Sequence, residues 1–251
     1  MSITYIVRTH GGLGNQLFQI FYAILLRNRV SGARLAVIHD SNYGHRFELD
    51  KNLEVAYSSK VGFIPNVISK ARIPKVISKL CQQEIGSFGI LNYRFLDGYF
   101  QNVRYYGSFD DTEIMVAVNE LKRCLVSSAK ECDKFKVLYH FRLLDFFRSE
   151  SEELKYIETQ FSDIPAESSI VSNNDNLFRS PEIQKFLDQK NINHIESDGL
   201  SSVNVLLLMM EYGTIHSNNS TLAFWAAIFN RCELNVGDDA LKNLYNLLLP
   251  K

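Results

Sequence analysis

The opening of the sequence, a glycine-rich turn set between a strand and a helix, restricts the possible folds more than any other feature. Residues 3–7 form an apolar run that predicts a buried strand, and residues 11–14 contain three glycines. Residues 15–29 then carry apolar side chains at spacings of three and four, which predicts a helix, and residues 33–38 predict a second strand. Strand, turn, helix and strand in this order predict a βαβ unit.

Strands and helices alternate again in the second half of the sequence. The run FKVLYHF at residues 135–141 predicts a buried strand that ends in polar residues. Shorter strands are expected at 168–171, 192–195 and 214–216, and helices from Pro181 and at 202–212, 220–230 and 239–248.

The first half is less regular after its opening. Residues 110–126 predict a helix, but residues 47–100 look irregular, with short basic surface helices at 64–80. Because strands and helices alternate on both sides of this region, we expect two α/β domains, residues 1–130 and 131–251.

Composition and charge exclude several classes of protein. The chain has 27 basic and 28 acidic residues, so no broad basic surface for nucleic acid is expected. Its four cysteines form no CxxC pair and have no histidine close by, which argues against zinc and fits a reducing compartment. The start lacks the pattern of a signal peptide, and the longest apolar run, residues 222–229, is too short to span a bilayer. These features predict a soluble, cytoplasmic protein.

The glycine-rich turn is the first of three segments suited to ligand binding. Its glycines let the backbone approach a ligand, and the helix that follows offers free amides to a phosphate or a sugar oxygen. It is not a P-loop, because no Lys-Ser/Thr follows, and not a GxGxxG motif, because Leu17 replaces the third glycine. A plain tight turn is the alternative.

The second segment runs from His140 to Asp145, at the carboxyl end of an expected strand. Ligands of open α/β sheets lie at that end. Strand alternation puts His140 and Arg142 on one side, and a guanidinium binds phosphate through two parallel hydrogen bonds. The alternative is an ion pair between Arg142 and Asp145 that closes the turn.

The third segment is the polar cluster from Ser217 to Thr221, which precedes an apolar helix. Hydroxyl groups and free amides at a helix start can bind a diphosphate. Ordinary helix capping, with Trp225 in the core, is the alternative.

Together these segments resemble the α-1,2-fucosyltransferases of glycosyltransferase family 11. The family's GGLGNQ-(M/L)-FQ segment is present from Gly11 to Gln19 without a mismatch, and its LDGYWQS-like segment corresponds to residues 96–101. Its HxRRxD donor motif corresponds to residues 140–145, and its SNSSFSWW-like segment to residues 218–225. The four matches are in register and are spread over most of the chain.

The sequence departs from the family pattern at four positions and is short for the family. Leu143 replaces the second arginine of the donor motif, so Leu143→Arg is expected to restore or raise turnover if the site has the family geometry. Asn173 and Asn174 replace an acidic pair, and Asn204 replaces an aspartate that reads the guanine edge in related fucosyltransferases. These changes bear on base recognition and on the identity of the sugar.

The resemblance implies a GT-B-like fold, two Rossmann-like domains facing across a cleft, with GDP-fucose in the C-terminal domain. It implies inverting transfer of L-fucose to a hydroxyl group, O2 of a terminal galactoside in a surface polysaccharide or its precursor. No metal or other cofactor is expected, and the sequence agrees in containing no Asp-x-Asp and no histidine cluster. The expected partners are the GDP-sugar and an oligosaccharide acceptor, which a lipid-linked glycan would present at the inner face of the membrane.

Roles for individual residues follow from the resemblance. Arg142 is expected to stabilise charge on the β-phosphate, and Asp145 or Glu150 to take the acceptor proton. Asp97 and Tyr99 are expected on the acceptor side, within an aromatic and basic stretch from Tyr93 to Tyr105 that would bind the glycan. The expected donor-binding residues are Gly12, Gly14, Asn15, His140, Arg142, Asn204, Asn219, Ser220 and Thr221.

Two other functions stay open at this point. One is transfer of another GDP-6-deoxyhexose, such as GDP-colitose. The other is an inactive relative that binds a nucleotide sugar or a glycan, which the changes at Leu143, Asn173 and Asn204 suggest. A donor screen distinguishes the first from fucosyl transfer, and product formation distinguishes the second.

Overall fold

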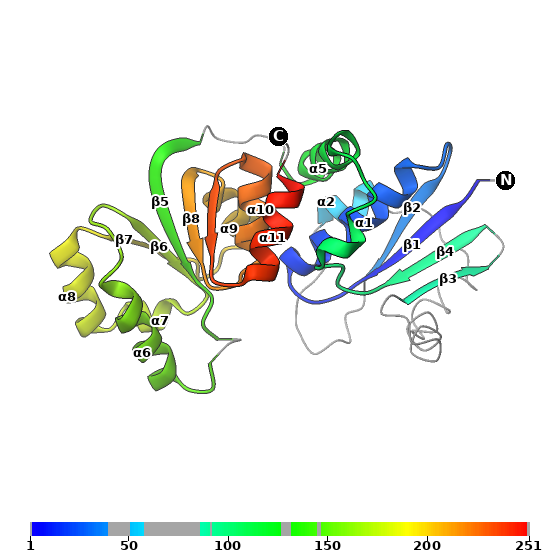
Figure 1. The fold of residues 1–251 in the computed structure, drawn as a ribbon. Coiled ribbons are helices and arrows are strands. Elements are labelled where there is room, and N and C mark those ends of the chain that lie inside the picture. The colour runs from blue at the N-terminus through cyan, green and yellow to red at the C-terminus, as the bar shows by residue number, and fades with distance from the viewer. Residues whose placement is uncertain are drawn as a thin grey trace. The chain divides into compact units, whose positions relative to one another are not determined.

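The computed structural model describes residues 2–39, 51–57, 86–90, 92–126, 132–144 and 147–249, and for 86–90 the backbone only. The chain divides into two compact units, Met1–Ser128 with Leu247–Lys251, and Ala129–Asn246. Both units combine helices with a sheet that is partly or wholly parallel (Figure 1), which confirms the predicted α/β class. Asp145 and the expected basic helices at 64–80 lie outside the described residues.

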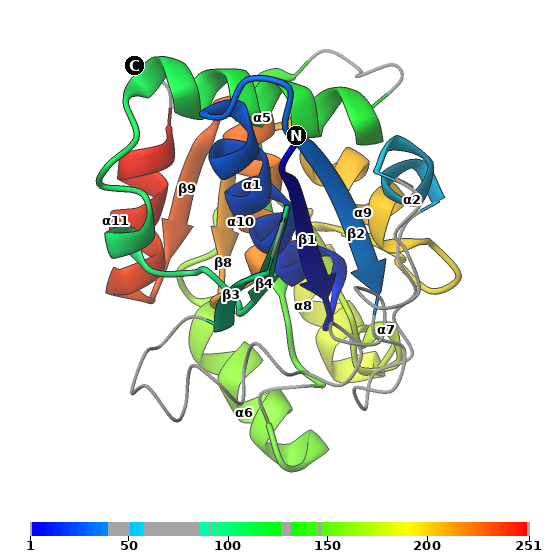
Figure 2. The ribbon, with the colours of Figure 1, turned by 90° about the vertical axis from the view of Figure 1, so that its right-hand side faces the viewer.

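The N-terminal unit is built on the predicted βαβ opening. Its described elements are β1 (Thr4–Thr9), α1 (Leu13–Asn28), β2 (Arg34–His39), α2 (Lys51–Ala56), β3 (Gly86–Ile90), β4 (Tyr93–Asp97), the 3₁₀ turn η1 (Val103–Tyr105) and α5 (Asp111–Leu125). The strands lie in the order β2-β1-β4-β3, with β1 parallel to β2 and β4, and with β3 antiparallel to β4. α1 packs against β1 and β2, and α5 lies against α1 (Figure 2).

Local sequence signals account for most of these elements. The strand expected at 3–7, the helix at 15–29 and the strand at 33–38 are confirmed to within two residues. The helix expected at 110–126 is α5, which begins with a capping box between Asp110 and Glu113. The description of residues 47–100 as irregular was wrong, because this stretch contains α2, β3 and β4.

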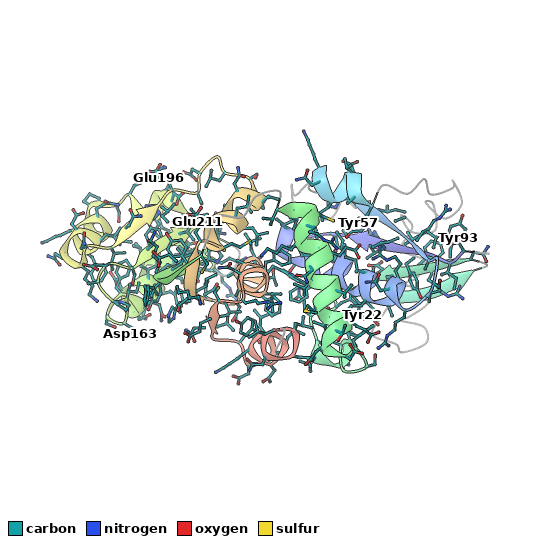
Figure 3. The ribbon with its side chains drawn as sticks, turned by 90° about the horizontal axis from the view of Figure 1, so that it is seen from above. Tyr22, Tyr57, Tyr93, Asp163, Glu196 and Glu211 are labelled. Atoms are coloured by element: carbon teal, nitrogen blue, oxygen red, sulfur yellow. The ribbon has the colours of Figure 1, made fainter. Side chains whose placement is uncertain are left out.

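Tyr57, which directly follows α2, attaches that short helix to α5 (Figure 3). Its hydroxyl group donates a hydrogen bond to Glu120 and accepts one from the thiol of Cys124. Burial and these two partners raise the pKa of Tyr57 far above its usual value, so the phenol stays protonated.

The C-terminal unit is a parallel five-stranded sheet with helices between its strands. Its described elements are β5 (Asp133–Phe141), α6 (Glu150–Phe161), β6 (Ser169–Ser172), α7 (Asp175–Phe178), α8 (Pro181–Lys190), β7 (Asn193–Ile195), α9 (Ser202–Met209), β8 (Tyr212–Ser217), α10 (Thr221–Asn230), β9 (Glu233–Val236) and α11 (Asp239–Leu248). The strand order is β7-β6-β5-β8-β9, so the chain builds outward from β5 in one direction and then returns to build in the other. In Figure 1, α6, α7 and α8 lie on one side of the sheet, and α9, α10 and α11 on the other.

The strands and helices expected in this half are confirmed, but α6, α7 and β9 were missed, and α7 is a single turn of four residues. α6 has few apolar residues, of which Ile157 and Phe161 are buried, and the strand β9 is only four residues long. Neither offers the long apolar period on which such a prediction depends.

A hydrophobic core fills the space between the sheet and α6, α7 and α8. It contains Phe141 and Leu143 from the end of β5 and the residues after it, together with Ile157, Ile170 and Phe178. Each fully buried side chain of this kind stabilises the fold by about 1.5–3 kcal/mol. The core therefore supports β5 from the side opposite to α9, α10 and α11.

Candidate functional site

The carboxyl ends of β5 and β8 define the place where this sheet is built to bind a ligand. The two strands are parallel neighbours, with His140 opposite Ser217, and the connections that follow them lead to opposite edges of the sheet. Ligands of such sheets bind at this switch point because the two loops separate there. β6 ends in Ser172 and β8 in Ser217, and β5 is followed directly by Arg142.

Two asparagine side chains hold the backbone that follows β5. The amide oxygen of Asn218 accepts a hydrogen bond from the Arg142 backbone N–H at 2.8 Å, and its NH₂ group donates to the Arg142 carbonyl at 2.7 Å. From the other side, the amide oxygen of Asn173 accepts from the Leu143 backbone N–H at 2.7 Å. We call this arrangement the asparagine clasp. It fixes the point from which the Arg142 side chain starts.

His140 lies beside this clasp as a buried, neutral imidazole. It is 7% exposed, and its Nδ1 lies 3.3 Å from the hydroxyl oxygen of Ser217. Burial, aided by the nearby charge of Arg142, lowers the pKa of His140 to about 3. A neutral imidazole offers one donor and one acceptor, so His140 can orient a ligand but cannot carry a positive charge to it near pH 7.

Helix α10 begins next to the same edge. Ser220 is its N-cap, and the Ser220 hydroxyl oxygen accepts from the Ala223 backbone N–H at 3.3 Å. Trp225 is completely buried, so the capping and core roles weighed as the plain alternative are what the structure shows for these two residues. The residue before the cap, Asn219, adopts a left-handed conformation with φ 60°, which asparagine tolerates better than most residues.

A cavity of about 650 Å³ opens at this edge, which we call the aromatic cavity. Tyr139 on β5 and His216 on β8 stack face to face in its lining, with ring centres 4.4 Å apart. Of the expected donor-binding residues, His140 and Asn219 line the cavity. Arg142, Ser220, Thr221 and Asn204 are not among its lining residues, and Asn204 lies on the exposed first turn of α9.

A second cavity, of about 400 Å³, lies beside the start of α6, and we call it the charged cavity. Its lining includes Arg148, the exposed Glu150 and the buried Glu153. Glu153 is 4% exposed and accepts a hydrogen bond of 2.6 Å from the amide of Asn174. Sequence reasoning did not single out Glu153, because a glutamate in a polar helical stretch normally faces solvent.

Three of the four positions that depart from the family pattern, Leu143, Asn173 and Asn174, lie close together, whereas Asn204 lies on α9. Leu143 is completely buried in the core described above, and Asn173 bonds to its backbone N–H. An aspartate in place of Asn174 would bring a second carboxylate next to Glu153. An arginine in place of Leu143 would be buried among apolar side chains, which argues against the expected gain from Leu143→Arg.

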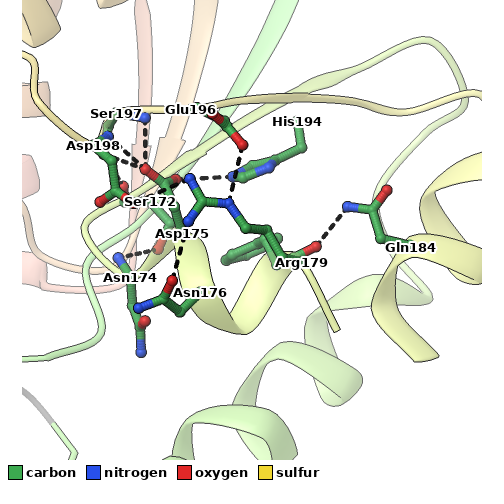
Figure 4. Close-up of polar contacts among 11 residues, drawn as sticks. Ser172, Asn174, Asp175, Asn176, Arg179, Gln184, His194, Glu196, Ser197 and Asp198 are labelled. Atoms are coloured by element: carbon green, nitrogen blue, oxygen red, sulfur yellow. Dashed lines mark hydrogen bonds and ion pairs between the residues drawn. The ribbon is translucent and has the colours of Figure 1, made fainter. Parts of the chain in front are cut away.

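A second buried acid of this region is Asp175, directly after the two asparagines (Figure 4). Its carboxylate accepts from the backbone N–H groups of Ser197 at 2.7 Å and Asp198 at 2.6 Å, and lies 3.0 Å from Nε2 of His194. Arg179 pairs with Asp198 and with one further carboxylate of the same loop. These contacts join the ends of β6 and β7 and give both carboxylate oxygens of Asp175 partners within the protein.

The glycine-rich turn of the N-terminal unit is shaped by Gly11 and Gly12. Gly11 has φ +78°, and a Cβ there would lie 3.0 Å from the Asn15 amide nitrogen, so only glycine fits. Gly12 is the N-cap of α1, and Gly14 is buried in the first turn. The Asn15 amide oxygen accepts a hydrogen bond of 2.8 Å from Gln101, which follows β4.

Asp97 and Tyr99 flank the same edge of the N-terminal sheet but differ in exposure. Asp97 is buried and forms an ion pair of 3.3 Å with the buried Arg8, so it supports the edge from within. Tyr99 is 41% exposed and contacts the ring of His10 edge-on. Tyr93, expected beside Tyr99 in a glycan-binding stretch, instead lies at the opposite end of β4 and packs on the core.

Two general features complete the description of the site. No helix among the described residues is long and apolar enough to cross a membrane. In the same parts of the chain, no three histidine, cysteine or acidic side chains are grouped so as to hold a metal ion.

Comparison with known proteins gives likenesses of structure only. The chain matches no sequence profile of a known family, and no curated protein is significantly similar to it. Among solved structures, it is similar to the NodZ alpha-1,6-fucosyltransferase soaked with GDP-fucose, with a TM-score of 0.46, 12% identity, and 90% of this chain and 92% of that chain covered. Fucosyltransferase NodZ from Bradyrhizobium gives a TM-score of 0.44 with 11% identity over 91% of this chain and 93% of that one. POFUT1 in complex with GDP gives a TM-score of 0.44 with 11% identity over 94% and 98%. At such TM-scores the likeness supports no argument, and the function proposed below depends on the residues of the site.

Proposed function

We propose that this chain is an inverting glycosyltransferase that moves L-fucose from GDP-fucose to a hydroxyl group, as the resemblance to glycosyltransferase family 11 suggests. The observation that supports it best is the asparagine clasp, which holds Arg142 at the switch point of the C-terminal sheet. An arginine whose backbone is held by the residues that lead into α10 can direct its guanidinium to a diphosphate bound there.

The reaction develops charges that residues at this edge of the sheet must stabilise. The acceptor oxygen forms a bond to the anomeric carbon while the bond from that carbon to the β-phosphate oxygen breaks, and GDP leaves with the electron pair. Positive charge develops on the sugar ring and negative charge on the phosphate, as in glycoside chemistry. Arg142 meets the negative charge, the amides at the start of α10 assist, and neutral His140 orients the nucleotide.

The acceptor proton needs a carboxylate within reach. Glu150 at the start of α6 is exposed and lines the charged cavity, so it is one candidate for this base. Asp145 is the other candidate base and lies outside the described residues. Asn15 and Tyr99, at the carboxyl edge of the N-terminal sheet, are assigned to the sugar and acceptor side of this proposal.

A donor and acceptor screen tests the proposal directly. The purified chain would be incubated with GDP-fucose or GDP-colitose and a set of terminal β-galactosides, and the products analysed by mass spectrometry and linkage analysis. We expect a fucosylated product with the new bond at O2. A product only with GDP-colitose would assign the other donor, and binding of GDP-fucose without any product would identify an inactive relative.

A further inference from the structure

The lining of the aromatic cavity differs in character from the rest of the site. Besides the Tyr139–His216 ring pair, it includes Tyr156 and Phe147, whose rings lie 5.0 Å apart between centres. Its volume of about 650 Å³ falls within the range of roughly 300–1,000 Å³ found for small-molecule sites. Aromatic surface of this extent at the edge of a sheet suits a ligand that has an apolar face.

The polar part of the lining is almost uncharged. Amide groups come from Gln160, Asn218 and Asn235, and no acidic residue is found among the described lining residues. The imidazole of His140 is neutral near pH 7, and burial lowers the pKa of His216 as well. The cation among the described lining residues is the exposed Lys242. A neutral ligand with many hydroxyl groups matches this set better than a diphosphate does.

Some of these polar groups have unused hydrogen-bonding capacity. Among the described residues, the partly exposed side-chain amide of Gln160 forms no hydrogen bond, and the Oδ1 of Asn219, which is buried, has no partner either. Because the Gln160 amide is accessible in the cavity lining, a ligand hydroxyl can bond to it without displacing a protein partner. The charged cavity, lined by Arg148, Glu150 and Glu153, offers no comparable aromatic surface.

We propose that the aromatic cavity binds a neutral hexose unit of the acceptor glycan, with the rings of Tyr139, Tyr156 and His216 against its apolar face and the amides of Gln160 and Asn219 on its hydroxyl groups. This inference rests on the proposed function and adds a glycan subsite in the C-terminal unit. The cavity borders His140 and Asn218, so the bound hexose lies next to the donor loop. The subsite thus selects the acceptor without touching the leaving phosphate.

Binding measurements on the full chain test this subsite independently of catalysis. Lactose and methyl β-D-galactoside would be titrated by NMR against the wild type, Gln160→Ala, His216→Ala and the control Lys155→Ala. Lys155 is an exposed residue of the same helix, α6, outside the cavity lining. The affinity for GDP-fucose would be measured by calorimetry on the same proteins.

We expect Gln160→Ala to weaken galactoside binding about five-fold, the effect of one lost hydrogen bond. Loss of a stacked ring in His216→Ala is expected to weaken it about ten-fold. Lys155→Ala, and the GDP-fucose affinity of all variants, should stay unchanged. Should His216→Ala fail to fold, Gln160→Ala on the helix surface still decides the question.

Three results would overturn the subsite: no galactoside binding by the wild type, galactoside binding that both cavity variants retain, or a selective loss of GDP-fucose binding. The last would mark the cavity as the nucleotide site. If the wild type binds galactosides through this cavity but does not bind GDP-fucose, the subsite stands and the proposed transferase function fails.

Discussion

The backbone at Arg142 is held at both its N–H and its carbonyl group by the single side chain of Asn218. Asn173 holds the next N–H from the opposite side. A long side chain such as arginine loses much freedom when it binds a phosphate, and a fixed starting point reduces that loss. At the scale of single residues, the proposal therefore predicts that the Arg142 side chain raises the rate of transfer. Asn173 and Asn218 are predicted to act by holding the backbone from which that side chain extends.

Removing the guanidinium of Arg142 should reduce turnover far more than stability. One preorganised donor of this kind typically contributes about 10²–10³ in kcat, so Arg142→Ala should lose about that factor. Arg142→Lys should recover only part of it, since an ammonium lacks the two-pronged geometry. Steady-state kinetics and circular dichroism measure the two effects, with the exposed Lys185→Ala as control. Near-normal activity in folded Arg142→Ala would place the donor phosphates elsewhere.

Leu143→Arg should destabilise the fold instead of improving the enzyme. Leu143 is completely buried and packs in the core with Ile157 and Phe178. An arginine there would be an uncompensated buried charge, a change that costs on the order of 3 kcal/mol or more. Urea unfolding monitored by circular dichroism would show a lowered midpoint, whereas Leu143→Met should stay near the wild type. An unchanged midpoint with raised turnover would support the family geometry instead.

At the scale of elements, the site depends on three parallel strands that end together. β5 carries His140 and leads into Arg142, β8 leads into Asn218, and β6 leads into Asn173. Their registers bring these residues to one edge because parallel strands all point the same way. The contacts between the loops then join the strand ends to each other.

Changing Asn218 should show whether it places the loop after β5 for catalysis or only stabilises the fold. Asn218→Asp keeps an acceptor for the Arg142 N–H but loses the donor to the Arg142 carbonyl and puts a negative charge beside it. We expect a loss of kcat of at least about ten-fold, with a change in unfolding free energy of about 1–2 kcal/mol. Asn243→Asp, at an exposed position on α11, serves as the matched control. Equal loss of stability and activity would mean that the clasp is merely structural.

At the scale of the whole molecule, stability should depend on pH through His140. Its folded-state pKa of about 3 lies below the 6.5 of an unperturbed histidine, so the unfolded chain binds the proton more strongly. The contribution is complete above pH 6.5 and is lost as the pH falls toward 3, with a slope of up to about 1.4 kcal/mol per pH unit. The unfolding free energy of His140→Gln should fall less steeply on acidification than that of the wild type. Parallel curves for the two proteins would contradict the burial of a neutral His140.

Transfer should also proceed without a divalent metal. The sequence has no Asp-x-Asp to hold a metal-bound diphosphate, so Arg142 and the start of α10 must meet the leaving charge. We expect the initial rate to be unchanged in excess EDTA. A loss of rate that magnesium or manganese restores would contradict this mechanism, and a metal-dependent glycosyltransferase assayed in parallel would confirm that the chelator works.

The sequence by itself determined the features that depend on neighbouring residues. The spacing of apolar residues predicted most strands and helices. The left-handed turn requires Gly11, and Ser220 caps α10. All three features depend on backbone preference and side-chain spacing over only a few residues. The residues around His140 and Arg142 were likewise recognisable from their place at a strand end.

Only the tertiary structure decided which distant residues share the site. Strand order sets Asn173 and Asn218 on either side of the loop after β5, and the same order buries Leu143, which the linear motif had placed among charged residues. The aromatic cavity combines side chains from β5, α6, β8 and β9, segments separated by many residues in the chain. Such contacts arise from packing of whole elements, and no local pattern specifies them.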